Sequence, residues 1–220
     1  MALAFVKLYG ISSSKIVKQA WLFIALSIFI FYSLIVIQRN KDWKDQITIF
    51  TKTIETHPYC REAHTYLGLA YQEKGLYDKA IPEYLKALKP NPRYYSFMRP
   101  GAILQNLGFI YYDRGLYDKS EFLYKKALIY QPGNANIYLS LGNIYFKKSL
   151  YDKAIGEFKT ALKINPFLVD ARHNLGLAYE KQGLHKKAIV QFENILEEYP
   201  DDEGVRYNLR CAYEALEKAK

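Results

Sequence analysis

A unit of about 34 residues repeats along most of this chain and restricts what it can fold into. The pair Leu-Gly occurs four times, and successive pairs are separated by 40, 34 and 34 residues. The glycines of these pairs are Gly68, Gly108, Gly142 and Gly176. A tyrosine follows each of them three residues later, and each unit ends with a proline: Pro92, Pro132, Pro166 and Pro200. Self-similarity at a fixed period indicates an array in which each repeat is one supersecondary unit.

The spacing inside one unit predicts two helices. Leu, Gly and Tyr at positions 7, 8 and 11 of the unit lie on one face of a first helix, where the glycine lets the partner backbone approach closely. Gly at position 15 can adopt the left-handed conformation that ends this helix. A small residue at position 20 and an aromatic residue at position 24 form the packing stripe of a second helix, which Asp78, Asp118 and Asp152 are placed to cap. The closing proline disfavours helix at the residue before it, so each unit is a helical hairpin.

These recurring positions resemble the tetratricopeptide repeat (TPR). The resemblance covers residues 61–94, 101–134, 135–168 and 169–202, and a six-residue insertion separates the first two units. Residues 203–220 keep Leu209 and Tyr213 in register, but Arg210 replaces the glycine, which predicts a capping helix with one solvated face. The resemblance implies an all-α fold, a TPR solenoid of helical hairpins. With the apolar run described below, we expect this solenoid to be preceded by one transmembrane helix.

The repeat register extends upstream of residue 61. Trp43, Phe50 and Pro58 fall on positions 17, 24 and 32, so residues 38–60 are predicted to form a half repeat that has only its second helix. The junction also resembles that between the last span and the repeats of transmembrane-and-TPR-repeat proteins, whose relatives include protein O-mannosyltransferases. The matching residues are Arg39, Asn40, Trp43, Asp45, Phe50 and Pro58. This resemblance implies an alternative identity as the C-terminal part of a polytopic membrane glycosyltransferase, from which no catalytic residue has a counterpart here.

An apolar run follows a short N-terminal flank, residues 1–19. Residues 20–37 contain no charge, proline or glycine, and as a helix they would reach about 27 Å, which matches a bilayer core. A cleaved signal peptide and a buried helix are the alternatives. The absence of a small-x-small site opposes the first, and apolarity on all sides opposes the second. We therefore expect single-pass membrane attachment through Ala20–Ile37, with the repeats extracytoplasmic by the junction resemblance.

The charge pattern and the scattered reactive residues exclude several classes of function. The net charge is +9, but residues 45–220 carry 25 Lys/Arg interleaved with 21 Asp/Glu, which argues against a nucleic-acid surface. No Ser-His-Asp arrangement, phosphate-binding glycine loop or His/Cys cluster is present. We expect no enzyme activity, no cofactor and no metal. Cys60 and Cys211 are four repeats apart, too far to pair in a straight array.

The remaining expectation is a protein-protein interaction scaffold that binds a protein or peptide in a concave groove. In tetratricopeptide arrays the first helices line this groove. The candidate residues are Gln72, Gln105, Asn106, Phe109, Tyr112, Asn136, Asn143, Phe146, Lys147, His173, Asn174, Lys181 and Asn208. Amides can pair with the backbone of an extended peptide, or they can serve only neighbouring backbone groups, and both interpretations stay open. The positions that form a carboxylate clamp for chaperone tails, Gln105, Asn136 and Asn174 among them, hold no cation, so we expect no such clamp.

Overall fold

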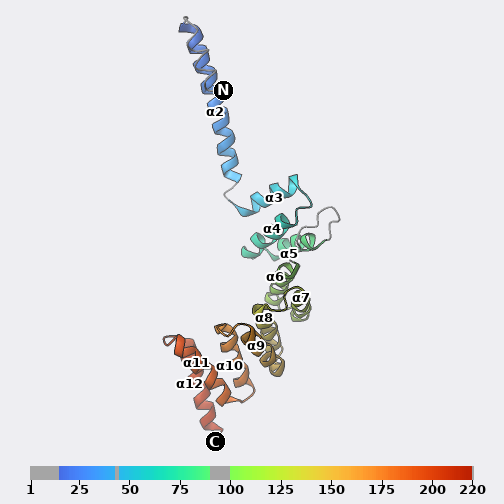
Figure 1. Ribbon diagram of the computed structural model, residues 1–220, viewed down its shortest axis with the longest axis vertical. Coiled ribbons are helices and arrows are strands. Elements are labelled where there is room, and N and C mark those ends of the chain that lie inside the picture. The colour runs from blue at the N-terminus through green and yellow to red at the C-terminus, as the bar shows by residue number, and fades with distance from the viewer. Residues whose placement is uncertain (1–14, 43–44, 90–99, 220) are drawn as a thin grey trace.

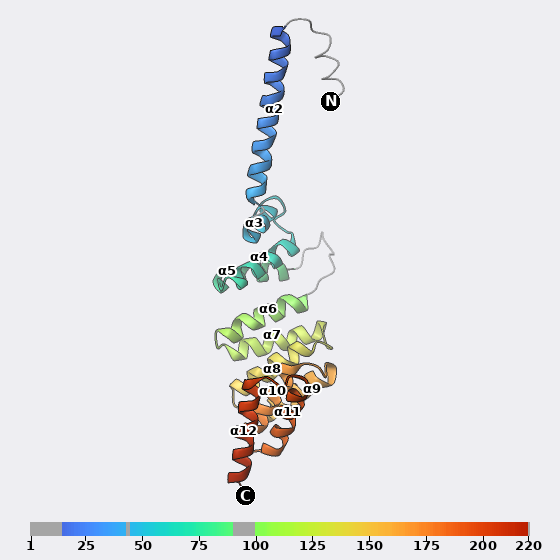
Figure 2. The same cartoon turned by 90° about the vertical axis from the view of Figure 1, so that its left-hand side faces the viewer.

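The computed structural model describes residues 15–42, 45–89 and 100–219, and all regular structure in these segments is helical. Helix α2 (Lys15–Asp42) comes first and is followed by α3 (Gln46–Thr56). Four antiparallel pairs then follow in order: α4 (Arg61–Glu73) with α5 (Tyr77–Leu88), α6 (Pro100–Asp113) with α7 (Tyr117–Tyr130), α8 (Ala135–Lys147) with α9 (Tyr151–Ile164), and α10 (Val169–Lys181) with α11 (His185–Glu198). The last helix is α12 (Glu203–Lys218). The pairs stack along the long axis of the molecule, with α2 at one end and α12 at the other (Figures 1 and 2).

Each hairpin closes through one glycine and one aromatic ring. A Cβ atom added at Gly68 would lie 2.8 Å from Tyr84 Cε1, and one at Gly176 would lie 2.6 Å from Phe192 Cε1. The other two glycines of the Leu-Gly pairs meet rings in the same way. The sequence prediction of a close approach is therefore confirmed in its position, but the glycine faces the aromatic ring at position 24 and not the partner backbone.

The turn within each hairpin has a left-handed residue. Gly75, Gly115 and Gly183 have φ angles of 71°, 71° and 73°, whereas the third repeat places Ser149 there with φ of 59°. Two backbone bonds close the turn in that repeat, from Ser149 N to Phe146 O at 2.9 Å and from Leu150 N to Tyr145 O at 2.8 Å. A residue with a Cβ atom thus adopts a conformation that favours glycine.

The aspartates at position 18 do not cap the second helices, so that expectation is wrong. The N-cap positions are leucines without side-chain cap bonds, which puts Asp78, Asp118 and Asp152 inside the first turn. Their carboxylates instead reach the next repeat, at the residue at position 14, which directly follows the first helix and begins the turn. Asp78 pairs with Arg114 at 2.7 Å, Asp118 with Lys148 at 2.6 Å, and Asp152 accepts a bond from Gln182 Nε2 at 2.6 Å.

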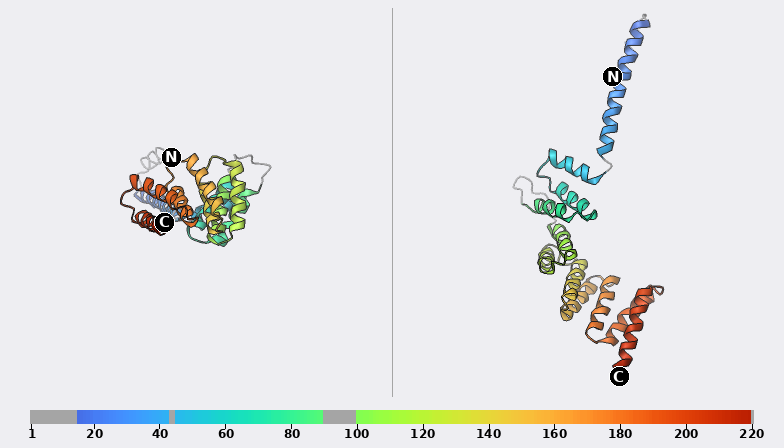
Figure 3. Two further views of the ribbon diagram at one scale, coloured as in Figure 1. Left: turned by 90° about the horizontal axis from the view of Figure 1, so that it is seen from below. Right: turned by 180° about the vertical axis from the view of Figure 1, so that it is seen from behind.

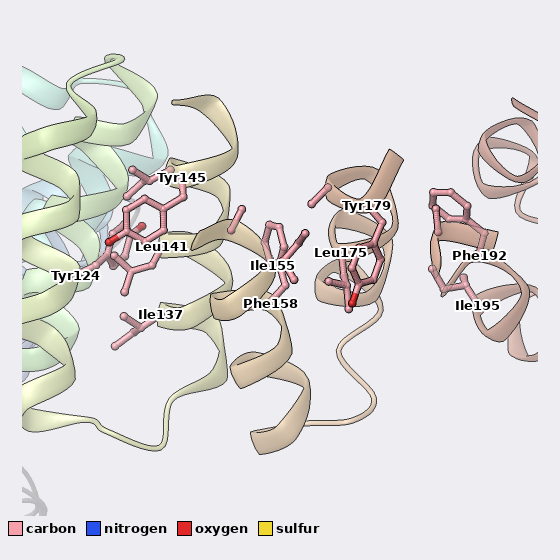
Figure 4. Packing of buried hydrophobic residues seen from close by; sticks show 14 of the residues in the cluster. Tyr124, Ile137, Leu141, Tyr145, Ile155, Phe158, Leu175, Tyr179, Phe192 and Ile195 are labelled. Atoms are coloured by element: carbon pink, nitrogen blue, oxygen red, sulfur yellow. The ribbon is translucent and has the colours of Figure 1, made fainter. Parts of the chain in front are cut away.

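One continuous hydrophobic core joins the hairpins from α6 to α12. Its fully buried members include Leu141, Ile144, Phe158 and Phe192, and it extends to Val205 and Ala212 of the last helix. Figure 4 shows labelled side chains of this core, from Tyr124 of α7 to Phe192 and Ile195 of α11. A second cluster, around Tyr84, joins α5 to α6. Burial between neighbouring hairpins is what holds a solenoid together, because each repeat contacts only its neighbours.

The first helices form the inner face of the stack. Within the described segments, helices α4, α6, α8, α10 and α12 each pack against the next of this set, whereas the second helices pack mainly on first helices. The helix axes of successive hairpins also point in different directions along the stack (Figure 3). The side on which helices approach one another most closely is the concave side of a curved array, so the first helices line the groove.

Helix α2 extends away from the stacked hairpins (Figure 1), and its apolar side chains, Phe23 and Phe29 among them, are exposed. Across the described residues, however, no helix combines the length with the apolarity needed to cross a membrane. The predicted transmembrane helix at residues 20–37, membrane attachment through Ala20–Ile37, and the single-pass location with extracytoplasmic repeats are therefore wrong.

Candidate functional site

A pocket of about 260 Å³ lies on the concave face where α6, α8 and α10 meet. Tyr112 comes from α6, and Asn143, Phe146 and Lys147 come from α8. Asn174 and Leu177 of α10 complete the lining. Three successive repeats thus contribute to one opening, because equivalent positions of their first helices face the same side.

The polar centre of this pocket is a pair of amides. Asn174 Nδ2 donates a hydrogen bond to Asn143 Oδ1 at 2.8 Å, and both side chains are half-buried. The bond fixes which way each amide points. It occupies the oxygen of Asn143 and one N–H of Asn174, and it leaves the Asn143 NH₂ group and the Asn174 oxygen for a ligand.

Two aromatic rings form the apolar walls, and each is held by a ring from the following helix. The Tyr112 ring packs on Tyr117 at a centroid distance of 5.7 Å, and the Phe146 ring packs edge-on to Tyr151 at 5.5 Å. Burial raises the pKa of the Tyr112 hydroxyl, and the neighbouring Tyr117 adds to the shift. Supported rings of this kind lose little further freedom when a ligand binds, which favours binding.

Five other candidates instead connect helices to one another. Asn106 Nδ2 donates to the Tyr84 hydroxyl at 3.2 Å, and that hydroxyl donates to Gln72 Oε1 at 2.8 Å. Asn208 Nδ2 donates to His173 Nε2 at 2.9 Å, and Gln105 Oε1 lies 3.5 Å from Asn134 Nδ2. Burial is the main cause that raises the pKa of Tyr84 to about 12, and the bond from Asn106 opposes it.

These bonds show a rule that the sequence did not predict. The asparagines at position 6, Asn106, Asn174 and Asn208, each donate to a side chain of the preceding repeat. They serve neighbouring side chains, and not the neighbouring backbone that we considered as their structural role. The asparagines at position 6 therefore link neighbouring repeats through side-chain hydrogen bonds.

The remaining three candidates, Phe109, Asn136 and Lys181, are exposed and lie outside the pocket lining. Phe109 keeps 44% of its surface accessible on α6. Leu177, in contrast, lines the pocket and was missed. It occupies position 9, the same as Phe109 and Asn143, so its place in the repeat could have identified it, although its side chain is neither polar nor aromatic.

Among the described residues, no group of three or more His, Cys, Asp or Glu side chains is placed to hold a metal ion. Cys60 and Cys211 are both free thiols. The arrangement at the groove offers hydrogen bonds, apolar contact and one cation, all of which can hold a ligand.

This geometry defines a class of protein, the all-α solenoid of antiparallel helical hairpins with a groove lined by first helices. A family model described as "TPR repeat" matches residues 108–149 and 142–183, and two described as "Tetratricopeptide repeat" match residues 40–95 and 170–202. The chain is therefore a tetratricopeptide-repeat protein. No curated protein matches it.

Solved structures of other repeat proteins have the same fold. A crystal structure of MamA protein is 29% identical with a TM-score of 0.63, and the match covers 70% of this chain and 81% of that one. A second MamA crystal structure is 25% identical with a TM-score of 0.62, covering 70% and 86%. The first TPR of Spaghetti (RPAP3), bound to the HSP90 peptide SRMEEVD, is 23% identical with a TM-score of 0.51, covering 53% and 92%, and shows likeness of fold alone. The comparisons give no support for the resemblance to glycosyltransferase-like membrane proteins.

Proposed function

We propose that this protein is a non-enzymatic interaction scaffold that binds an extended peptide segment of a partner protein in the groove of its first helices. The pocket between α6, α8 and α10 carries this proposal, because it combines an oriented amide pair with apolar walls. Peptide binding is known for the fold from the RPAP3 domain with its HSP90 peptide.

The amide pair matches the needs of a peptide backbone. An extended segment presents N–H and C=O groups that must be paired when they are desolvated. The free NH₂ group of Asn143 can donate to a carbonyl, and the free oxygen of Asn174 can accept from an amide. One side chain of the bound segment fills the apolar space between Tyr112, Phe146 and Leu177. No cation clamp is part of this proposal, so the partner is recognised along its length and not by a terminal carboxylate.

We also propose the division into repeats at residues 61–94, 101–134, 135–168 and 169–202, with a half repeat at 38–60 and a capping helix at 203–220. Helix α3 lies against α4 as a second helix would, and its Phe50 ring stacks on Tyr66 at 5.2 Å. One family model spans residues 40–95, across this boundary. Trp43, which also supported the half repeat, lies outside the described residues, as does most of the flank at 1–19.

The test uses the full chain and a displayed library of random dodecapeptides. Selected peptides are measured by fluorescence anisotropy against the wild type and against Asn143→Ala and Asn174→Ala. Each variant should bind about tenfold more weakly, because it removes a peptide contact and leaves the partner amide without its own bond. Asn194→Ala is the matched control, since Asn194 lies on the second helix α11 and should not matter. Unchanged affinity in both groove variants would refute the proposal.

A further inference from the structure

In each of the four hairpins, the last residue of the first helix carries an exposed charge, and the sign of this charge changes halfway along the array. Helix α4 ends at Glu73 and α6 at Asp113, whereas α8 ends at Lys147 and α10 at Lys181. All four occupy position 13 of their repeats and lie at equivalent ends of the first helices, so we treat them as one row along the array. The row is acidic in the first two repeats and basic in the last two.

Helix stability does not explain this row. The C-terminus of a helix carries the negative end of the helix dipole, so Lys147 and Lys181 are favourably placed, whereas Glu73 and Asp113 are not. Two acids at unfavourable helix ends, followed by two cations at equivalent ends, are an arrangement that internal stability would not select.

The neighbouring row at position 14 does not cancel these charges, because its members already have partners. Lys74 pairs with Asp45 at 3.0 Å, Arg114 with Asp78 at 2.7 Å, and Lys148 with Asp118 at 2.6 Å. In the part of the chain that the structure describes, none of the four charges at position 13 has an ion pair. The nearest acid to Lys181 on its own helix, Glu180, lies 2.9 Å from His185 Nδ1.

The change of sign coincides with the pocket. Lys147 is both the first cation of the row and part of the pocket lining. A segment seated in the pocket therefore has acids of the protein on one side, along α4 and α6, and cations on the other, along α8 and α10. Asp170, the acid in the first turn of α10, is eleven residues from Lys181 and thus about 16 Å away along the helix.

We infer that the groove selects a partner segment of polarised charge: an apolar side chain sits in the pocket, acidic residues lie over α8 and α10, and basic residues lie over α4 and α6. This inference rests on the proposed peptide-binding function. Complementary charge steers encounter and fixes the register of a bound segment, and like charge rejects the reversed orientation. The row therefore fixes which way a peptide lies.

The test swaps the row without changing the net charge. The variant Glu73→Lys, Asp113→Lys, Lys147→Glu, Lys181→Glu is compared with the wild type, using a dodecapeptide selected on the wild type and the same peptide with its acidic and basic residues exchanged. The wild type should prefer the selected peptide by about tenfold, and the swapped protein should prefer the exchanged peptide by a similar factor. The matched control is Lys163→Glu, Lys186→Glu, Glu197→Lys, Glu198→Lys, four exposed sites on the second helices α9 and α11, and it should keep the wild-type preference.

Failure of this inference is distinguishable from failure of the proposed function. If selected peptides depend on Asn143 and Asn174 but the swapped protein keeps the wild-type preference, the charge inference is wrong and the groove stands. If neither asparagine matters, both fail. If circular dichroism shows that the fourfold variant is not folded, the double variant Lys147→Gln, Lys181→Gln is used instead. Its affinity for the selected peptide should be lower and should depend less on salt concentration. An unchanged salt dependence would overturn the inference.

Discussion

Replacing Ser149 by glycine should stabilise the protein. Among the described residues, Ser149 is a non-glycine residue that has a left-handed backbone conformation. The residues at the same position of the other three repeats are Gly75, Gly115 and Gly183. An L-residue in this conformation costs about 1–2 kcal/mol, and the greater freedom of glycine in the unfolded chain costs about 0.5–1 kcal/mol. The net gain in the free energy of unfolding should therefore be about 0.5–1 kcal/mol. The side chain itself contributes little, since its one hydrogen bond, from the Tyr151 hydroxyl, is 3.4 Å long and exposed.

The reciprocal change is the control. A Cβ atom added at Gly115 would have no other atom within 4 Å, so Gly115→Ser tests backbone conformation without a steric clash. It should destabilise by about as much as Ser149→Gly stabilises. Repeat arrays do not always unfold in one step, so the best assay is native-state hydrogen exchange at the amides of α8 and α9, supported by urea unfolding. If Ser149→Gly leaves protection unchanged or lowers it, the assignment of strain to this turn is wrong.

Three further substitutions test the packing and the bonds between repeats. Gly176→Ala should destabilise the protein by about 1–3 kcal/mol in urea unfolding, because its Cβ atom would lie 2.6 Å from the Phe192 ring. The control Gly156→Ala, with no other atom within 4 Å of its Cβ, should not destabilise it. Equal effects of the two substitutions would contradict the role given to the Phe192 ring. Partial burial alone would raise the pKa of Glu121, but bonds from Lys125, Lys148 and Tyr145 lower it to about 2. The contribution of Glu121 to the free energy of unfolding should be present above its unfolded pKa, near 4.5, and lost as the pH falls towards 2. Glu121→Gln should therefore be less stable than the wild type at pH 7 and nearly as stable near pH 2. A stability difference that does not depend on pH would refute this. Tyr84→Phe removes a buried hydroxyl that bonds to two side chains and should cost about 1–2 kcal/mol, measured by thermal unfolding; a neutral effect would mean that those bonds contribute nothing.

The sequence predicted the hairpins well because their determinants lie within one repeat. Leu-Gly on the first helix and an aromatic residue sixteen positions later have to meet whenever two helices of this length fold back on each other, as Gly142 and Phe158 do. The left-handed turn is equally local, and even the departure at Ser149 leaves its conformation unchanged. Because the same residue pattern recurs in four repeats, a single sequence was enough to predict these contacts within a hairpin.

Contacts between repeats were harder to predict. The sequence predicts that Asp118, at the second position of α7, is a cap, because an aspartate at a helix start ordinarily bonds to the backbone there. Its actual partner, Lys148, is thirty residues away, and no pattern inside one repeat indicates it. The apolar run at residues 20–37 misled in another way: it correctly predicted a helix, but the inferred membrane span is not supported by the described part of that helix.

The groove illustrates how one position can serve both structure and binding. At position 6, Asn106 and Asn208 donate to Tyr84 and His173, residues that do not line the pocket. Asn174 makes the same kind of bond, but its acceptor, Asn143, lies in the pocket with its own NH₂ group unused. Under the proposed function, a link between repeats becomes a binding element only where its acceptor also lines the pocket. Among the three asparagines at position 6, Asn174 is the one that donates to a residue at position 9 of the preceding unit, so we propose it as the amide that meets a ligand.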